Sequence, residues 1–201
     1  YGYEMTKLYD NGNVCEVSKN DRPVYTFWDL GMDDPTAIVF AKIINKQIYI
    51  IDFYENTGHD IGHYIEIIRN KNYKYAGHFM PHDAKKRNNT VGVNILDFCR
   101  TEYGFRAEPI PKTNSVRDDI EIVRRNLPDI LINEKVDTLI DHLKNYQWNP
   151  TTGKILHNEH SHAADAVRMM FMAYHHGMIK EYLIKSDKPK LEYVTDDWML
   201  L

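Results

Sequence analysis

The sequence predicts a mixed α/β fold, in which a sheet is flanked by helices. Three β-rich segments follow one another closely, at residues 24–30, 37–44 and 47–54. The two-residue turn Asn45-Lys46 between the last two is typical of an antiparallel hairpin. Helical and strand patterns then follow, and an apolar helix around Asp165 ends the series. We therefore expect a mixed sheet whose first three strands are antiparallel and which helices cover.

The later elements are predicted from their end signals and apolar spacing. Asp60 precedes isoleucines three or four residues apart, which predicts a capped helix. Ser115 followed by Asp118 predicts the start of another helix. In chain order we expect a helix from Asp60, a strand ending near Met80, a helix around 91–99, a strand at 105–110, helices from Ser115 and from Asn133, a hairpin over 146–157 and the helix of Asp165.

The length of 201 residues suits one domain with a core of its own. Residues 1–22 show a weak pattern and are interpreted as a lead-in segment, whereas residues 178–201 are charged, contain Pro189 and are interpreted as a C-terminal tail. The main domain is therefore expected at residues 23–177. Because the chain begins at Tyr1 without methionine, we expect it to be a fragment of a longer protein.

Composition narrows the class of protein. A formal net charge of −4 argues against a wholly basic surface that would grip nucleic acid everywhere. The two cysteines are too few and too distant for a disulfide framework or a thiolate zinc site. No apolar stretch is long enough to span a bilayer, and no secretory signal appears. We expect a protein of a reducing cytoplasm with no membrane partner.

Asp165 stands on the same helix face as Met169 and Met172, which should point into a core. An unpaired carboxylate buried there would cost several kcal/mol, so it needs a cation or a hydrogen-bond network; the alternative is a solvent-facing acid in a first helical turn. Asp29 and Asp83 favour the buried site, because each follows a β-rich run. Three converging carboxylates would repel one another unless divalent cations such as Mg²⁺ or Mn²⁺ lay between them.

Three motifs surround these aspartates. They are Trp28-Asp29-Leu30-Gly31 followed by Asp34-Pro35-Thr36-Ala37, Pro81-His82-Asp83-Ala84, and His160-Ser161-His162-Ala163-Ala164-Asp165-Ala166. With their spacing and the helix beginning at Ser115, they resemble the C-terminal nuclease domain of the large terminase subunit of tailed bacteriophages. The resemblance covers roughly residues 20–176.

The resemblance implies an RNase H-like fold in which Asp29, Asp83 and Asp165 are the catalytic, metal-binding acids. It implies a DNA endonuclease that cuts concatemeric viral DNA during genome packaging, with two divalent cations, Mg²⁺ or Mn²⁺, at the scissile phosphate. Implied partners are double-stranded DNA, an N-terminal ATPase domain of the same protein, the portal and the small terminase subunit. The expected location is the host bacterial cytoplasm, not the virion. No phosphate-binding loop of the G-x-x-x-x-G-K-[ST] type occurs in this chain, so residues 1–22 would lead in from the missing ATPase domain.

Further residues near the aspartates are weaker candidates. Lys85-Lys86-Arg87 follows Asp83, where a phosphate-bearing substrate would approach, although most charge runs are solvated faces. His82 and His162 are candidates for orienting a neighbouring aspartate. Asp34 is a candidate outer ligand, but an aspartate that caps a turn before Pro35 explains it equally well.

Three alternatives remain open. His157, His160 and His162 cluster as in a zinc site, yet no cysteine accompanies them, which favours hydrogen-bonded structural histidines. A Holliday-junction resolvase or ribonuclease H-type nuclease would use similar acids on the same fold. A non-catalytic module that docks onto a motor or portal would not need the aspartates.

Overall fold

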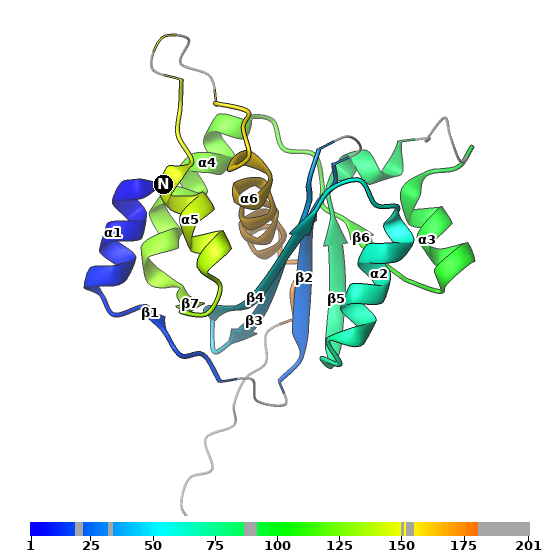
Figure 1. The fold of residues 1–201 in the computed structure, drawn as a ribbon, viewed down its shortest axis with the longest axis horizontal. Coiled ribbons are helices and arrows are strands. Elements are labelled where there is room, and N and C mark those ends of the chain that lie inside the picture. The colour runs from blue at the N-terminus through cyan, green and yellow to red at the C-terminus, as the bar shows by residue number, and fades with distance from the viewer. Residues whose placement is uncertain (19–21, 32–33, 87–91, 150, 152–154, 181–201) are drawn as a thin grey trace, which may run out of the picture.

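A computed structural model of the chain describes residues 1–18, 22–31, 34–86, 92–149, 151 and 155–180. A seven-stranded sheet in the order β1-β7-β4-β3-β2-β5-β6 forms its centre (Figure 1). The strands are β1 (Val14–Cys15), β2 (Val24–Asp29), β3 (Thr36–Ile44), β4 (Gln47–Asn56), β5 (Tyr75–Met80), β6 (Glu108–Pro109) and β7 (Leu131–Asn133). The helices are α1 (Gly2–Asp10), α2 (Ile61–Asn70), α3 (Ile95–Tyr103), α4 (Val116–Asn126), α5 (Asp137–Asn145) and α6 (Ser161–His175), with 3-10 turns η1 (His82–Lys85) and η2 (Leu127–Asp129).

The sheet is mixed, as predicted. β2, β3 and β4 are antiparallel to one another, whereas β5 runs parallel to β2 and β7 parallel to β4. Asn45 and Lys46 both have positive φ, the conformation that a two-residue hairpin turn between twisted strands requires. The prediction of a mixed sheet in which the strands expected at 24–30, 37–44 and 47–54 are antiparallel is confirmed.

Helices cover both faces of the sheet. α6 lies along one face beside α4 and α5, while α2 and α3 pack on the other (Figure 1). The strand residues divide accordingly, because successive side chains point to opposite faces. Phe27, Ala37 and Val39 belong to the core cluster with α6, whereas Trp28 and Ile38 belong to the cluster with α2 and α3. Residues of β2 and β3 with the parity of Phe27 and Ala37 therefore face α6.

Two predicted helix caps are confirmed and one is wrong. The side chains of Asp60 and Ser115 each accept a hydrogen bond from a backbone N–H in the first turn of α2 or α4. α5 instead begins after Val136. Asn133 ends β7, and its buried side chain donates to the carbonyl of Ile51 at 3.2 Å. This side chain therefore bonds to the sheet and does not cap α5.

The segment interpreted as a lead-in contains α1, whose Met5 and Leu8 are fully buried in the cluster with α6. The strand predicted at 105–110 is reduced to β6. In the hairpin region, an isolated antiparallel bridge joins Trp148 to Ile155. The tail lies outside the described residues from 181 onward. None of the described helices has both the length and the apolar character needed to cross a membrane.

Candidate active site

Asp29 is the last residue of β2, and its side chain shares the face of Phe27, toward α6. The first turn of α6 brings His162 to it, and Asp29 Oδ2 accepts a hydrogen bond from His162 Nδ1 at 3.0 Å. This hydrogen bond raises the pKa of His162, burial opposes the rise, and the nearby charges of Asp29, Asp34 and Asp165 add to it. The end of a central strand and the start of α6 therefore meet at an acid and an imidazole.

Asp165 lies one turn further along α6 and is held by Arg168. Arg168 Nε donates to Asp165 Oδ1 at 3.0 Å, and its Nη1 lies 3.3 Å from Asp119 Oδ2 on α4. Asp119 also accepts a hydrogen bond from Thr113 Oγ1 at 2.6 Å. Burial raises the pKa of Asp165, the Arg168 charge opposes this effect, and the Asp29 charge adds to it. The Asp29 charge acts on Asp165, and both charges act on His162, so the fold brings these two carboxylates near each other.

The donor chemistry of this pair fits a hard divalent cation. Among the described residues, Asp29 Oδ1 and Asp165 Oδ2 accept no hydrogen bond, which leaves one carboxylate oxygen of each aspartate open. Carboxylate oxygens are the ligands that Mg²⁺ and Mn²⁺ prefer. Within the described parts of the chain, no group of three or more His, Cys, Asp or Glu side chains could hold a metal ion.

Asp83 belongs to the neighbouring strand end but makes other contacts. β5 runs parallel to β2 with Phe79 opposite Phe27, so the two strands end at the same edge of the sheet. Asp83 lies in η1 just beyond β5, where its Oδ1 is 2.7 Å from His82 Nε2 and 2.8 Å from Lys86 Nζ. The Lys86 hydrogen bond lowers the pKa of Asp83, burial opposes the shift, and the His82, Lys86 and Lys112 charges add to it. Of the three predicted acids, the structure joins Asp29 and Asp165 and places Asp83 beside basic partners.

The loop between β2 and β3 brings another acid to the site. Thr36 Oγ1 bonds to both the N–H and the carbonyl of Gly31, which closes this loop. A Cβ on Gly31 would lie 2.1 Å from the carbonyl oxygen of Asp34, so only glycine allows so close a turn. The Asp34 charge contributes to the raised pKa of His162, which places this candidate outer ligand in the electrostatic environment of Asp29.

The fold is similar to those of several solved large terminase structures. A large terminase from a thermophilic bacteriophage, solved in complex with ATP-gamma-S, matches with a TM-score of 0.67 and 18% identity, over 84% of this chain and 44% of its own. The P22 large terminase nuclease domain matches with a TM-score of 0.65 and 18% identity, over 80% of this chain and 86% of its own. The g2p large terminase nuclease domain from bacteriophage SPP1, solved with bound Mn, matches with a TM-score of 0.55 and 20% identity, over 78% of this chain and 88% of its own.

The fold is RNase H-like, as in these nuclease domains. The predicted resemblance to large terminase nuclease domains is thereby confirmed in three dimensions. The chain spans less than half the length of the terminase solved with ATP-gamma-S. No family model and no curated protein matches the sequence.

The basic residues and histidines predicted near the site differ in their contacts and exposure. Lys86 is paired with Asp83, Lys85 is exposed on the same turn, and Arg87 lies outside the described residues. His82 contacts Asp83, its neighbour in sequence, whereas His162 contacts Asp29 from another element of the fold.

Arg168, which holds Asp165, and Asp119, which holds Arg168, were not singled out from the sequence. Arg168 follows Asp165 by three positions, the spacing of neighbouring side chains on one helix face. Asp119 lies four residues before the buried Val123 on α4 and therefore shares its core-facing side. A charged residue at a core-facing helix position is a signal that a partner of opposite charge lies across the interface.

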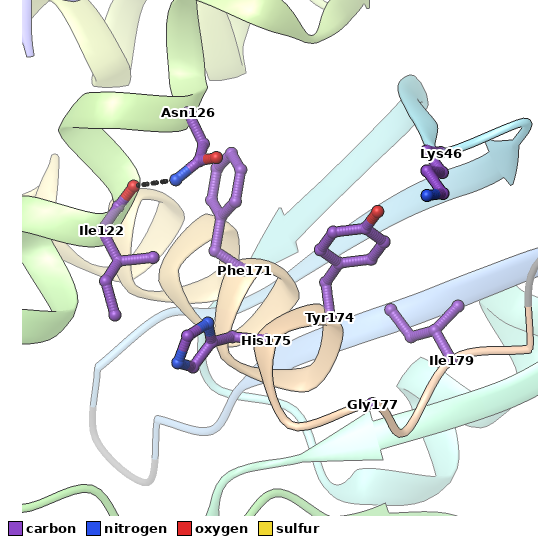
Figure 2. A pocket seen from close by; sticks show the side chains of 8 residues that line it. All are labelled: Lys46, Ile122, Asn126, Phe171, Tyr174, His175, Gly177 and Ile179. Carbon is purple, nitrogen blue, oxygen red and sulfur yellow. Dashed lines mark hydrogen bonds between the residues drawn. The ribbon is translucent and has the colours of Figure 1, made fainter.

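A separate pocket of about 490 Å³ lies at the other end of α6 (Figure 2). It is lined by Lys46, Ile122, Asn126, Phe171, Tyr174, His175, Gly177 and Ile179. None of the predicted acids lines it, so this pocket is distinct from the site of Asp29 and Asp165.

Proposed function

We propose that this chain is the nuclease domain of a large terminase, a metal-dependent endonuclease that hydrolyses phosphodiester bonds of double-stranded viral DNA during packaging. The observation that carries the proposal is the meeting of Asp29 and Asp165 at the end of β2, where one carboxylate oxygen of each accepts no hydrogen bond from the described residues. The SPP1 nuclease domain, which shares the fold, contains Mn in its structure.

The proposed ligands are Asp29, Asp165 and Asp83, with two Mg²⁺ or Mn²⁺ ions as cofactors. Such ions lower the pKa of an attacking water and stabilise the charge of the leaving oxygen. His162 fixes the orientation of the Asp29 carboxylate, and Arg168 fixes that of Asp165. These contacts use only one oxygen of each carboxylate.

Asp83 joins the site only when its contact with Lys86 is released. The Lys86 ammonium is exposed and lies on a flexible side chain, so a DNA phosphate is a competing partner for it. We propose that Lys85, Lys86 and Arg87 contact the phosphate backbone, and that DNA binding frees Asp83 for the metal. Phosphate contacts carry no base information, which predicts weak sequence preference.

The whole protein is proposed to be longer than this chain. The thermophilic phage terminase, of which the chain covers 44%, was solved in complex with ATP-gamma-S. We propose an N-terminal ATPase domain before residues 23–177, with the portal and the small terminase subunit as further partners and the host bacterial cytoplasm as the place of action.

Plasmid cleavage tests the proposal. The chain is incubated with supercoiled DNA and Mn²⁺, Mg²⁺ or EDTA, beside the variants Asp29→Asn, Asp83→Asn and Asp165→Asn. We expect metal-dependent nicking and linearisation, reduced by about 100-fold or more in each variant, because each removes a carboxylate ligand. Asp141→Asn on α5, an exposed aspartate bonded to Asn145, is the matched control and should cleave like the unmodified chain.

Other substrates separate the alternatives. A four-way junction or an RNA–DNA hybrid cleaved in preference to duplex DNA would favour a resolvase or a ribonuclease H-type enzyme. No cleavage of any substrate by folded protein, together with no Mn²⁺ binding in calorimetry, would contradict the nuclease and favour a docking module.

A further inference from the structure

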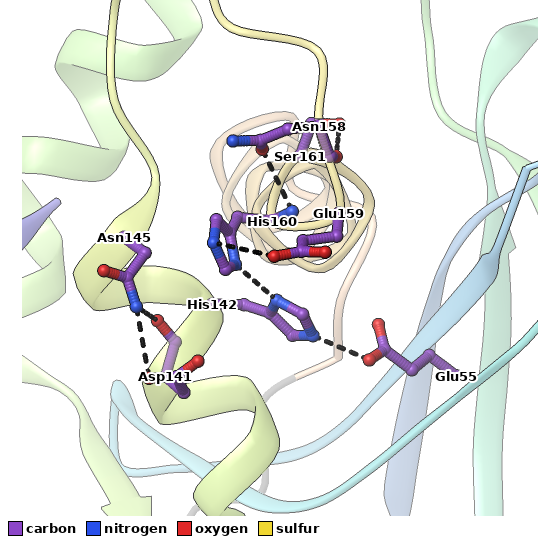
Figure 3. Close-up of polar contacts among 8 residues, drawn as sticks. All are labelled: Glu55, Asp141, His142, Asn145, Asn158, Glu159, His160 and Ser161. Carbon is purple, nitrogen blue, oxygen red and sulfur yellow. Dashed lines mark hydrogen bonds and ion pairs between the residues drawn. The ribbon is translucent and has the colours of Figure 1, made fainter.

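The start of α6 carries two residues of the proposed site, His162 and Asp165. Its N-cap residue, His160, makes no side-chain cap to its own helix. The His160 side chain instead leaves the helix and lies against α5, where its Nδ1 is 2.9 Å from His142 Nδ1 (Figure 3). The first turn of α6 is therefore anchored to another element as well as locally, where the Asn158 side chain accepts from the His160 N–H and the Asn158 carbonyl accepts from the Ser161 hydroxyl.

His142 extends this contact to the sheet. Its Nε2 lies 2.6 Å from Glu55 Oε1 on β4, so a carboxylate and two imidazoles form one chain (Figure 3). The imidazole of His142 is held at both nitrogens, which fixes its ring between β4 and α6. Within the described residues, the second oxygen of Glu55 is buried and has no hydrogen-bond partner.

Glu55 stands in the same cross-strand row as Asp29. Ala37 of β3 is paired with Asp29 on one side and with Glu55 on the other. Directly paired residues of an antiparallel sheet point to the same face, so both acids face α6 and are separated by two strand spacings, about 10 Å. Each acid meets a histidine: Asp29 meets His162, and Glu55 meets His142, which meets His160.

The chain of bonds is directional and partly buried. The side chains of His142 and Glu55 are 10% and 22% exposed, and that of His160 is 16% exposed. A contact between two Nδ1 atoms needs one proton between them, which fixes the orientation of both rings. Directional bonds in such surroundings are stronger than the same bonds in water.

We propose that Glu55, His142 and His160 are positioning residues, which fix the first turn of α6 so that His162 and Asp165 stand opposite Asp29. This inference rests on the proposed nuclease function. None of the three residues needs to touch metal or DNA. Their effect passes through the helix backbone, because His160 is two residues from His162 and five from Asp165.

Two substitutions of His160 provide the test. His160→Ala removes the bond to His142, whereas His160→Asn keeps a side-chain nitrogen or oxygen close to the Nδ1 position. Amide hydrogen exchange at residues 164–166 and at 169–173 reports the two parts of α6, and calorimetry reports Mn²⁺ affinity. Asp141→Asn, next to His142 on α5, is the matched control.

In His160→Ala we expect exchange about tenfold faster at residues 164–166, with residues 169–173 unchanged. We also expect a dissociation constant for Mn²⁺ raised about tenfold, as for other losses of ligand-orienting contacts. His160→Asn should recover most of both effects, and Glu55→Ala should reproduce the defect of His160→Ala.

Three results would overturn the positioning role: unchanged exchange in His160→Ala, faster exchange with unchanged Mn²⁺ affinity, or a His160→Asn variant as defective as His160→Ala. A failure of the proposed function looks different, because the unmodified chain would then bind no Mn²⁺. In that case the exchange at residues 164–166 alone decides whether the contact fixes the helix start.

Discussion

Asp29 and Asp83 follow neighbouring parallel strands that end at the same edge of the sheet, yet their surroundings differ. The side chain of Asp29 is 20% exposed and lies under α6, where a histidine of that helix contacts it. The side chain of Asp83 is 53% exposed and lies in a 3-10 turn, where the ammonium of Lys86 contacts it. One strand end is covered by a packed helix and the other is open.

The aspartates on the two sides of the site differ in how firmly their side chains are held. On the covered side, Asp29 and Asp165 are oriented by His162 and by Arg168, and Arg168 is itself held by Asp119. On the open side, the lysine partner is long, flexible and easily exchanged. We infer a fixed half that defines the metal position and an adjustable half that responds to substrate. Matched substitutions in the two halves should therefore differ in their effects.

The largest expected effect is on the fixed half. Arg168→Met leaves Asp165 and Asp119 without their shared cation, and loss of one partner of a buried ion network costs about 3 kcal/mol of unfolding free energy. Lys86→Met removes an exposed pair, which is worth less than about 1 kcal/mol. Urea unfolding of both variants measures the contrast. Equal losses of stability would contradict the division into a fixed and an adjustable half.

The next contrast concerns the carboxylate charges of Asp165 and Asp83 and their effect on stability. Burial raises the pKa of Asp165, so its ionised form disfavours folding, whereas the Lys86 hydrogen bond lowers the pKa of Asp83. The folded state therefore gains stability from Asp165 as the pH falls through the raised pKa, and Asp165→Asn should lack this gain. At pH 7 the asparagine carries no charge to bury, so this variant should unfold at a higher urea concentration than the unmodified chain. Asp83→Asn should leave the urea midpoint nearly unchanged. A lower midpoint for Asp165→Asn at pH 7 would show that the Arg168 contact outweighs burial.

The fixed half was predictable only in part. The apolar spacing around Asp165 indicated a core-facing acid that needs a partner, and the β-rich run before Asp29 indicated a strand end. Both expectations depend on local periodicity, which the sequence carries directly. The partner of Asp165, Arg168, lies three residues further along the same helix. The second partner of Arg168, Asp119, comes from α4, and packing between helices leaves a weaker trace in the sequence.

The adjustable half and the histidine chain show the limit of local signals. Asp83 was predicted at a strand end, and it does follow β5, but its pairing with Lys86 depends on the conformation of a short turn. His160 was considered for zinc or a structural hydrogen bond, while His142 and Glu55 carried no local signal because their contact joins β4 to α5. Likewise α1 was not predicted, since its burial depends on contacts with α5 and η2.

A smaller effect is expected from His162. The hydrogen bond to Asp29 raises the pKa of His162 above its unfolded value of about 6.5, so this contact stabilises the fold fully below pH 6.5 and loses that contribution as pH rises through the folded pKa. Unfolding of His162→Gln relative to the unmodified chain should therefore show a larger deficit at pH 6 than at pH 9. His82→Gln on the open turn is the control, for which we expect a small deficit at both pH values. A deficit in His162→Gln that grows with pH would contradict the bond to Asp29.

The smallest effect is expected from Lys85, which is exposed on the η1 turn beside Lys86. If Lys85 contacts one phosphate, Lys85→Ala should weaken binding to duplex DNA of any sequence by a few-fold and reduce the slope of log affinity against log salt by about 1. Fluorescence anisotropy with labelled duplexes at several salt concentrations measures both quantities. An unchanged slope in Lys85→Ala would show that this side chain lies away from the DNA backbone.

Lys86→Ala provides the matched comparison, because both lysines are exposed on one turn but Lys86 is the one paired with Asp83. Its salt slope should fall as in Lys85→Ala. Since the substitution also removes the ammonium from the Asp83 carboxylate, its Mn²⁺ affinity without DNA should rise, whereas that of Lys85→Ala should change little. Calorimetry with Mn²⁺ separates the two variants. An equal gain in Mn²⁺ affinity in both would mean that general charge, and not release of Asp83, controls the open half.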